Sequence, residues 1–184
     1  PGTLALRYAP TALTLGQFGT NDTGSGPNSP LVLDGSGNLY GTTSSGGATG
    51  HGTIFEIDHA TGAIITLASA ATAEGFGTGL VRDSSGNLYG TTPSYTDSNG
   101  YYVNGTVFEL SKGTGSSWTL STVASFDAQP GLVLDGAGNL YGTTLGGEND
   151  YGTVFELSRG SGPGWTLGTL VSFSFRAAFS NGAY

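Results

Sequence analysis

Three aspartates recur at one position of a repeated segment, and their type and spacing could support chemistry. Asp34, Asp83 and Asp135 are each followed by Gly at i+3 and Asn at i+4. A ring of carboxylates could bind calcium, which takes oxygen ligands, but no bidentate Glu follows at the spacing of a calcium loop. An aspartate also hydrogen-bonds its own backbone in tight turns. We therefore interpret the three as structural turn residues and predict no metal site.

Tyrosine and glutamate recur in the same way. One tyrosine follows each aspartate, and one glutamate follows a phenylalanine in every repeat: Tyr40, Tyr89 and Tyr141, and Glu56, Glu109 and Glu156. The tyrosines could form an aromatic ledge for sugars, but packing between repeats with a satisfied hydroxyl is the favoured interpretation. A catalytic site needs its residues only once, so recurrence in every repeat favours a structural role.

The two histidines, His51 and His59, flank one predicted strand. They have no cysteine partner and are expected at opposite ends of that strand. Exposed turn residues are favoured over a metal site or a general base. The chain contains no Gly-X-Ser-X-Gly, P-loop or His-Glu-X-X-His motif. We predict no catalytic residue, no enzymatic activity and no cofactor.

The residues outside the repeat pattern are the better candidates for binding. The longest loop, residues 93–104, contains Tyr95, Tyr101 and Tyr102. Packing within the repeat does not require these tyrosines, and loop aromatics often form binding surfaces. They are predicted to form a ligand or interface site, and a glycan ledge and a protein interface both remain open.

Two Asn-X-Thr sequons, at Asn21 and Asn104, are candidate N-glycosylation sites. Both lie in or next to predicted loops, where attachment of a glycan is sterically feasible. The sequence therefore also predicts a glycoprotein.

Composition excludes several classes of partner. The chain has 184 residues, with five basic and thirteen acidic side chains and a net charge of −8. Binding to nucleic acid needs a cluster of Lys and Arg, which is missing. No stretch approaches the ~18 apolar residues of a membrane span, so membrane insertion is not expected. Low charge with abundant Gly, Ser and Thr is typical of an extracellular or cell-surface protein.

The elements that position these residues follow a period of about 50 residues, which indicates a repeat architecture. Each period contains four short apolar runs separated by turn residues, and in the last one these runs are residues 132–134, 140–144, 152–158 and 165–173. No window has the apolar spacing of a helix. The sequence thus predicts an all-β fold of β-propeller blades, each of four antiparallel strands.

The repeat divides the chain into three full blades and part of another. Residues 1–30 align with strands three and four and a connector, and the blades are residues 31–79, 80–130 and 131–184. Propellers close with about four to eight blades, so this count leaves open edges. Further blades of a longer chain, several copies in one ring, or an open edge-to-edge array could complete them.

The repeated segment resembles a known family. Residues 131–144, Gly-Leu-Val-Leu-Asp-X-X-Gly-Asn-Leu-Tyr-Gly-Thr-Thr, followed by Gly-Thr-Val-Phe-Glu-Leu, resemble the GloVer-type tandem repeat of bacterial and metagenomic surface proteins. The core is also similar to NHL-like and two-component-regulator propeller repeats. The resemblance implies an exported or cell-surface propeller without established catalytic activity. The chain departs from a complete member in lacking an anchor, a signal peptide and enough blades.

Together these observations predict a non-catalytic extracellular or cell-surface module with a structural or adhesive role. Its expected partners are further blades or other copies of itself, including self-assembly into a fibre. The alternative is a carbohydrate-binding propeller that uses the loop at 93–104. A polysaccharide-active enzyme is the third hypothesis, and fold alone cannot decide among them.

Overall fold

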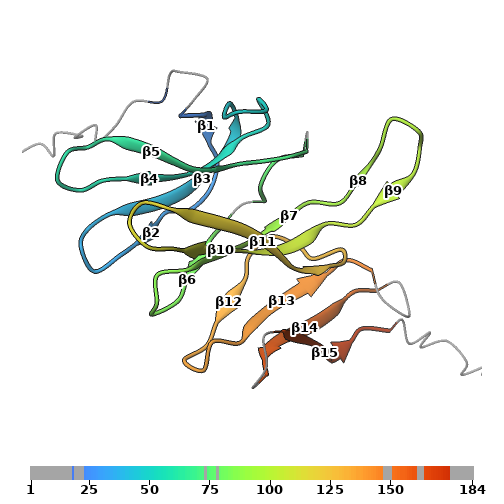
Figure 1. Cartoon of the computed structure of the whole chain (residues 1–184). Coiled ribbons are helices and arrows are strands. Elements are labelled where there is room, and N and C mark those ends of the chain that lie inside the picture. The colour runs from blue at the N-terminus through green and yellow to red at the C-terminus, as the bar shows by residue number, and fades with distance from the viewer. Residues whose placement is uncertain are drawn as a thin grey trace, which may run out of the picture.

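The computed structural model describes residue 18 and residues 23–72, 74–77, 79–146, 151–160 and 164–174. Within these residues the strands form three antiparallel sheets and one short hairpin, and there is no helix (Figure 1). Nowhere in these parts is there a helix with the length and apolarity of a membrane span. The all-β prediction is confirmed.

Each sheet has the strand pattern predicted for one repeat: a two-residue first strand pairs with the second, the second with the third, and the third with the fourth. The first sheet contains β1 (Ser25–Pro27), β2 (Val32–Leu33), β3 (Leu39–Ser45), β4 (Thr53–Ile57) and β5 (Ile64–Ser69). The second contains β6 (Val81–Arg82), β7 (Leu88–Thr92), β10 (Thr106–Lys112) and β11 (Trp118–Ser125). The third contains β12 (Val133–Leu134), β13 (Leu140–Thr144), β14 (Thr153–Arg159) and β15 (Trp165–Ser172).

The three sheets share their register, including one irregularity. In the third sheet Gly142 lies opposite Phe155, and the pairing of β14 with β15 shifts between Val154 and Phe155. The same shift occurs at the equivalent step of β4 and of β10. A β-bulge bends a strand and increases its twist. The sheets therefore have the same shape, which allows one to stack on the next.

The glycine of each Leu-Tyr-Gly-Thr-Thr segment is required by the phenylalanine opposite. A Cβ added to Gly90 would lie 2.5 Å from the Cζ of Phe108, and one added to Gly142 would lie 2.5 Å from the Cζ of Phe155. Because these distances are too short for contact, a larger residue would displace the ring. Glycine in a strand often marks such a close approach, which explains why the two motifs recur together.

The connector into each sheet runs along the edge of that sheet's second strand. The amide of Gln129 donates to the carbonyl of Thr143 at 2.8 Å. In the first sheet this edge is paired more extensively, because β1 lies antiparallel to β3. Only a connector was predicted there, so β1 is an additional strand. Pro27 ends it, and an edge strand tolerates the missing N–H of proline.

The core lies between the sheets. We call the face that carries the recurring tyrosine the front face, and the face that carries the strand-three phenylalanine the back face. In each junction the front face of one sheet packs on the back face of the next. Tyr40, Ile54, Leu80, Leu88, Phe108 and Leu110 fill the first junction. Tyr89, Val107, Leu132, Leu140, Phe155 and Leu157 fill the second.

Of the predicted half blade and connector at residues 1–30, only residues 18 and 23–30 are described. Phe18 is described, and its ring packs edge-on against Phe55 with centroids 4.8 Å apart. Phe126 contacts Phe155 in the same way at 4.7 Å. The half blade, the number of blades, the propeller assignment and the domain boundaries remain predictions.

Candidate functional site

Each recurring aspartate closes the turn between the first two strands of its sheet. In the third sheet, Oδ1 of Asp135 accepts hydrogen bonds from the amides of Ala137 and Asn139 at 2.9 and 2.8 Å. The side chain of Asn139 donates to Oδ2 at 2.9 Å. Gly138 completes the turn with φ of 88°, a conformation that favours glycine. The other two aspartates make the equivalent bonds with their own Asn residues.

The tyrosine six residues after each aspartate donates a hydrogen bond from its hydroxyl to the carboxylate of that aspartate. The hydroxyl of Tyr89 lies 3.0 Å from Oδ2 of Asp83 and 3.1 Å from Oε1 of Glu109, and it can donate its proton to either. The ring is 1% exposed. Burial raises the pKa of Tyr89, and the nearby carboxylates raise it further. The phenol therefore stays protonated and acts as a donor between two acids.

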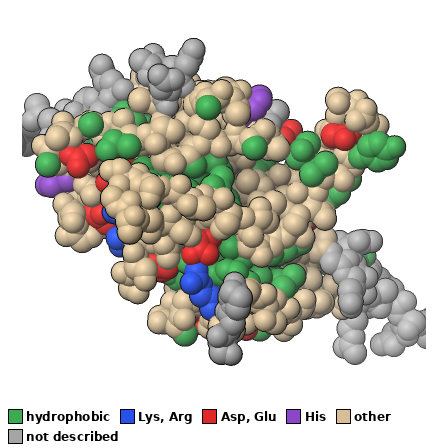
Figure 2. Space-filling model, viewed as in Figure 1, with side chains coloured by type: hydrophobic (Ala, Val, Ile, Leu, Met, Phe, Trp, Pro, Cys, Tyr) green, Lys and Arg blue, Asp and Glu red, His purple; other side chains and the backbone are tan. Residues whose placement is uncertain are grey.

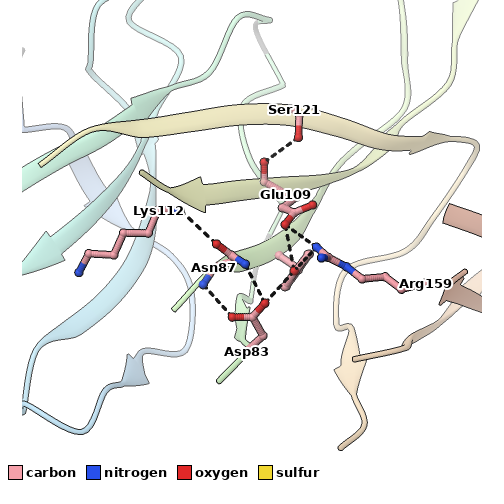
Figure 3. A network of polar contacts seen from close by, with 7 residues as sticks. Asp83, Asn87, Glu109, Lys112, Ser121 and Arg159 are labelled. Atoms are coloured by element: carbon pink, nitrogen blue, oxygen red, sulfur yellow. Dashed lines mark hydrogen bonds and ion pairs between the residues drawn. The ribbon is translucent and has the colours of Figure 1, made fainter. Parts of the chain in front are cut away.

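A cation from the next sheet completes this group. Arg159, at the end of β14, donates from Nη2 to Oε1 of Glu109 at 2.5 Å and to the hydroxyl of Tyr89 at 2.8 Å (Figure 3). Its guanidinium lies 4.7 Å from the ring centroid of Trp165, which packs edge-on against Tyr89 at 5.8 Å. We call Asp83, Tyr89, Glu109, Arg159 and Trp165 the junction network.

Hydrogen bonds hold the Asp83 carboxylate of this junction in its ionised form. Burial pushes the pKa of Asp83 upward, but hydrogen bonds from the Asn87 side chain, the Asn87 amide and Tyr89 outweigh it and lower the pKa. The Asn87 side chain also accepts from the amide of Lys112 at 3.1 Å, which ties the turn to strand three (Figure 3). An ionised acid beside a cation stabilises the contact between sheets.

The first junction has the same aromatic pair without the ion pair. Trp118 packs edge-on against Tyr40 with centroids 6.4 Å apart, and Nζ of Lys112 lies 5.5 Å from the Trp118 centroid. Among the described residues no ion pair joins Lys112 to Glu56. Burial, with the charge of Glu56 and a hydrogen bond to Asp34, raises the pKa of Tyr40 to about 12.

The loop at residues 93–104 contains a hairpin that the sequence analysis did not predict. Strand β8 (Tyr95–Thr96) pairs with β9 (Tyr102–Val103), and the hairpin projects from the second sheet (Figure 1). Its turn repeats the geometry of the recurring turns, because Oδ1 of Asp97 accepts from the amides of Asn99 and Tyr101. Hydrophobic side chains gather at its outer end (Figure 2).

The three candidate tyrosines of this hairpin lie in different environments. Tyr101 and Tyr102 are 72% and 60% exposed, whereas Tyr95 is half-buried. Only Tyr102 lines a cavity of about 520 Å³ beside the third sheet, together with Asp127, Phe155 and several Thr and Ser residues. The hydroxyl of Ser94 donates to Asp127 at 2.8 Å and fixes this carboxylate at the base of the hairpin.

The structure separates the remaining candidates. His51 precedes β4 and His59 follows it, so the two histidines do not converge. Within the described residues no three His, Cys, Asp or Glu side chains are grouped to hold a metal ion. Asn104 is exposed just before β10. Asn21 lies outside the described residues.

Comparison with known families identifies the repeat. Residues 2–131 match the Gloeobacter/Verrucomicrobia repeat, which is well over half of the 184 residues. The chain belongs to this family. Among curated proteins, none matches the chain. The third Gloeobacter/Verrucomicrobia-type segment, from residue 132 onward, lies past the matched range but has the same turn, glycine and phenylalanine positions.

The residues that connect the sheets of this Gloeobacter/Verrucomicrobia repeat protein were not predicted from its sequence. Lys112 and Arg159 occupy one repeat position, and Trp118 and Trp165 occupy another. Trp118 and Trp165 are the two tryptophans of the chain, and Lys112 and Arg159 are two of its five basic residues. Their coincidence in the last two repeats was the available signal.

Proposed function

We propose that the chain is a non-catalytic propeller-type module of an extracellular or cell-surface protein, whose role is to stack with further repeats of its own kind. The observation that carries this proposal is the equivalence of the two junctions, in which a front face meets a back face through the same positions. Each sheet has one face for its predecessor and one for its successor. Such a heterologous contact extends or closes an array.

The use of the recurring polar residues supports a structural role. Asp83, Tyr89 and Glu109 are engaged in bonds within and between sheets. The low charge of the chain and the resemblance to surface repeats support an extracellular location.

Light scattering after size-exclusion chromatography tests this assembly role on the full chain. We expect the average mass to rise with protein concentration as copies associate through their end faces. A charged substitution on the front face of the third sheet, Val133→Asp, should reduce this rise. The matched control is Ser116→Asp, at an exposed position of the turn between β10 and β11. A folded monomer at every concentration would contradict the assembly role.

A second function, carbohydrate binding, is favoured by the cavity beside the hairpin. Its wall combines the ring of Tyr102, the carboxylate of Asp127 and the hydroxyls of Thr144, Thr153 and Ser172. An aromatic ring stacks on the apolar face of a sugar, and carboxylate and hydroxyl groups bond its hydroxyls. The equivalent cavity at the second sheet is smaller, about 300 Å³, and has neither Tyr nor Asp in its wall.

Glycan-array screening of the full chain tests this second function. We expect Tyr102→Ala to abolish binding, because its ring forms part of the cavity wall. Tyr101→Ala is the matched control, since Tyr101 is next in sequence and exposed but does not line the cavity. Equal loss of binding in both variants, or none in either, would remove the cavity as a glycan site.

A further inference from the structure

The front face of the third sheet repeats the two front faces that are buried in the junctions, but it is exposed in the described structure. Thr42 and Thr91 are 0% and 1% exposed in their junctions. Thr143, at the same position of β13, is exposed. Val133 is 62% exposed, whereas its equivalents in the first two sheets, Val32 and Val81, are partly buried against the junction cores.

The rest of the face follows the same pattern. Leu170 and Phe173 are each 52% exposed, and Val171 is 48% exposed. Their equivalents in the second repeat, Val123, Ala124 and Phe126, pack against the core of the second junction. Phe173 also repeats the backbone bond of Phe126, because its amide donates to the carbonyl of Gly152 as that of Phe126 does to Gly105. The face is therefore already in the shape that the second junction uses.

The polar half of the network is also present on this face. The hydroxyl of Tyr141 lies 3.1 Å from Oδ2 of Asp135 and 3.0 Å from Oε1 of Glu156. In the second junction Arg159 bonds the equivalent tyrosine and glutamate, Tyr89 and Glu109, and Trp165 packs against the ring of Tyr89. Within the described part of the chain, no Lys or Arg pairs with Glu156. Two carboxylates and a phenol here form an acidic patch beside the exposed apolar side chains of the same face.

We infer that this front face is the docking surface for one further repeat with a particular cation and a particular tryptophan. That repeat has an Arg or Lys at the end of its third strand and a Trp at the start of its fourth. The cation meets Glu156 and Tyr141, the indole packs on the ring of Tyr141, and the back-face phenylalanine packs on Phe173. The inference rests on the proposed stacking role and names the partner that the stacking requires.

The first sheet of a second copy fits this surface less well. Strand register places His59 and Gly62 of the first repeat at the positions of Lys112 and Trp118. That sheet therefore offers neither a permanent cation nor an indole to the acidic patch. Its phenylalanine, Phe55, is already covered by Phe18. Charge and shape both favour a repeat of the second or third type over a second copy of this chain.

A single introduced thiol tests the surface, because the chain contains no cysteine. The full chain is extended by inserting a second copy of residues 127–173 directly after Phe173. Thr143→Cys is made in the native and extended chains. Its rate of reaction with a thiol reagent is measured at a protein concentration so low that light scattering gives the mass of a single chain. We expect a fast reaction in the native chain and a reaction slowed by about tenfold or more in the extended chain, because a covered thiol reacts only when the contact opens.

Two controls make the outcome specific. Thr91→Cys, at the buried equivalent position, should react slowly in both chains. In a second extended chain, the inserted counterparts of Arg159 and Trp165 are replaced by His and Gly, the residues of the first repeat. This replacement should restore fast reaction at residue 143.

Three results would overturn the inference. Thr143→Cys that stays reactive in the extended chain shows that no repeat docks, and equal protection by the His/Gly insert shows that the Arg–Trp pair is not recognised. Slow reaction in the native chain shows that the surface is already covered by another part of the same chain. Light scattering of the native chain is independent of the inserted repeat, so failure of the assembly role is distinguished from failure of this docking surface.

Discussion

The two junctions between sheets have the same apolar packing but different charged contacts. In both, a front-face tyrosine packs edge-on against a tryptophan of the next sheet. In the second junction Arg159 bonds Glu109 and Tyr89, whereas in the first Lys112 lies over Trp118 and forms no ion pair with Glu56 within the described residues. The guanidinium is planar and presents several donors, so it can bond two acceptors while stacking on a ring, which an ammonium does less well. Apolar packing thus defines the repeat, and the choice of Arg or Lys adjusts each junction.

The largest expected effect tests the packing that both junctions share. Phe108→Ala and Phe155→Ala should each lower the free energy of unfolding by about 3–5 kcal/mol, because each removes a buried ring and leaves a cavity. Urea denaturation measures both. Thr166→Ala, an exposed change on β15, is the control and should stay within about 0.5 kcal/mol. A clear difference between the two Phe variants would show that the junctions do not share their apolar packing.

A smaller effect should distinguish the tyrosines. The hydroxyl of Tyr89 contacts Asp83, Glu109 and Arg159, whereas that of Tyr40 is bonded to Asp34 without a cation. Bonds to charged groups contribute about 1.5–3 kcal/mol, and Tyr89 contacts three such groups whereas Tyr40 is bonded to one. Tyr89→Phe should therefore cost about 2–3 kcal/mol and Tyr40→Phe about 1.5 kcal/mol. Chemical denaturation of the two variants tests this order. Equal losses would mean that Arg159 adds nothing to the hydroxyl contact.

The cations themselves should have smaller effects. Arg159→Met should cost about 1–2 kcal/mol, through loss of a partly exposed ion pair and of the contact with Trp165. Lys112→Met should cost less than about 1 kcal/mol, because only the cation–π contact is lost. Unfolding should be measured at low salt and at 1 M salt. Since salt screens exposed charges, the difference in unfolding free energy between Arg159→Met and Lys112→Met should shrink at high salt. If that difference is the same at both salt concentrations, it arises from packing.

The last expected effect appears only at alkaline pH. Burial raises the pKa of Tyr40 from 10.0 to about 12, and it raises that of Tyr89 as well. Because the pKa is higher in the folded state, the phenol ionises first in the unfolded state, and this ionisation favours unfolding at high pH. The stability that the protonated phenols contribute is therefore fully present below pH 10 and is lost as pH rises towards 12. The free energy of unfolding should fall across that range, and the fall should be smaller in the double variant Tyr40→Phe, Tyr89→Phe. An identical fall would place the titration elsewhere.

The strands were predictable because their signals are local. Alternation of apolar residues, the Asp-X-X-Gly-Asn turn and the Gly–Phe pair lie within about one repeat of each other. The turn at Asp97 has the same Asp-X-X-Gly spacing, but Tyr101 replaces the Asn at i+4, and the hairpin that it closes was missed. β1 was missed because it pairs only with the edge of β3, and Ser-Gly-Pro has little strand propensity of its own.

The junction network could not be predicted by the same means. Arg159 is 70 residues from Tyr89 and 50 from Glu109. Which of the recurring side chains would meet depended on which face of each sheet turned towards the next. The candidate tyrosines were also resolved only in three dimensions, because Tyr101 and Tyr102 are adjacent in sequence but only Tyr102 lines the cavity.

The sequence by itself determined that the chain repeats, that each repeat is a small antiparallel sheet, and that its Asp and Gly residues form turns. Those properties arise from residues that are close along the chain. Only the tertiary structure decided the environment of each recurring residue. Tyr89 is buried and bound to Arg159 because a sheet covers it, whereas Tyr141, with the same local sequence, remains partly exposed. Burial and pairing depend on the neighbouring sheet, which a repeat cannot encode within its own residues.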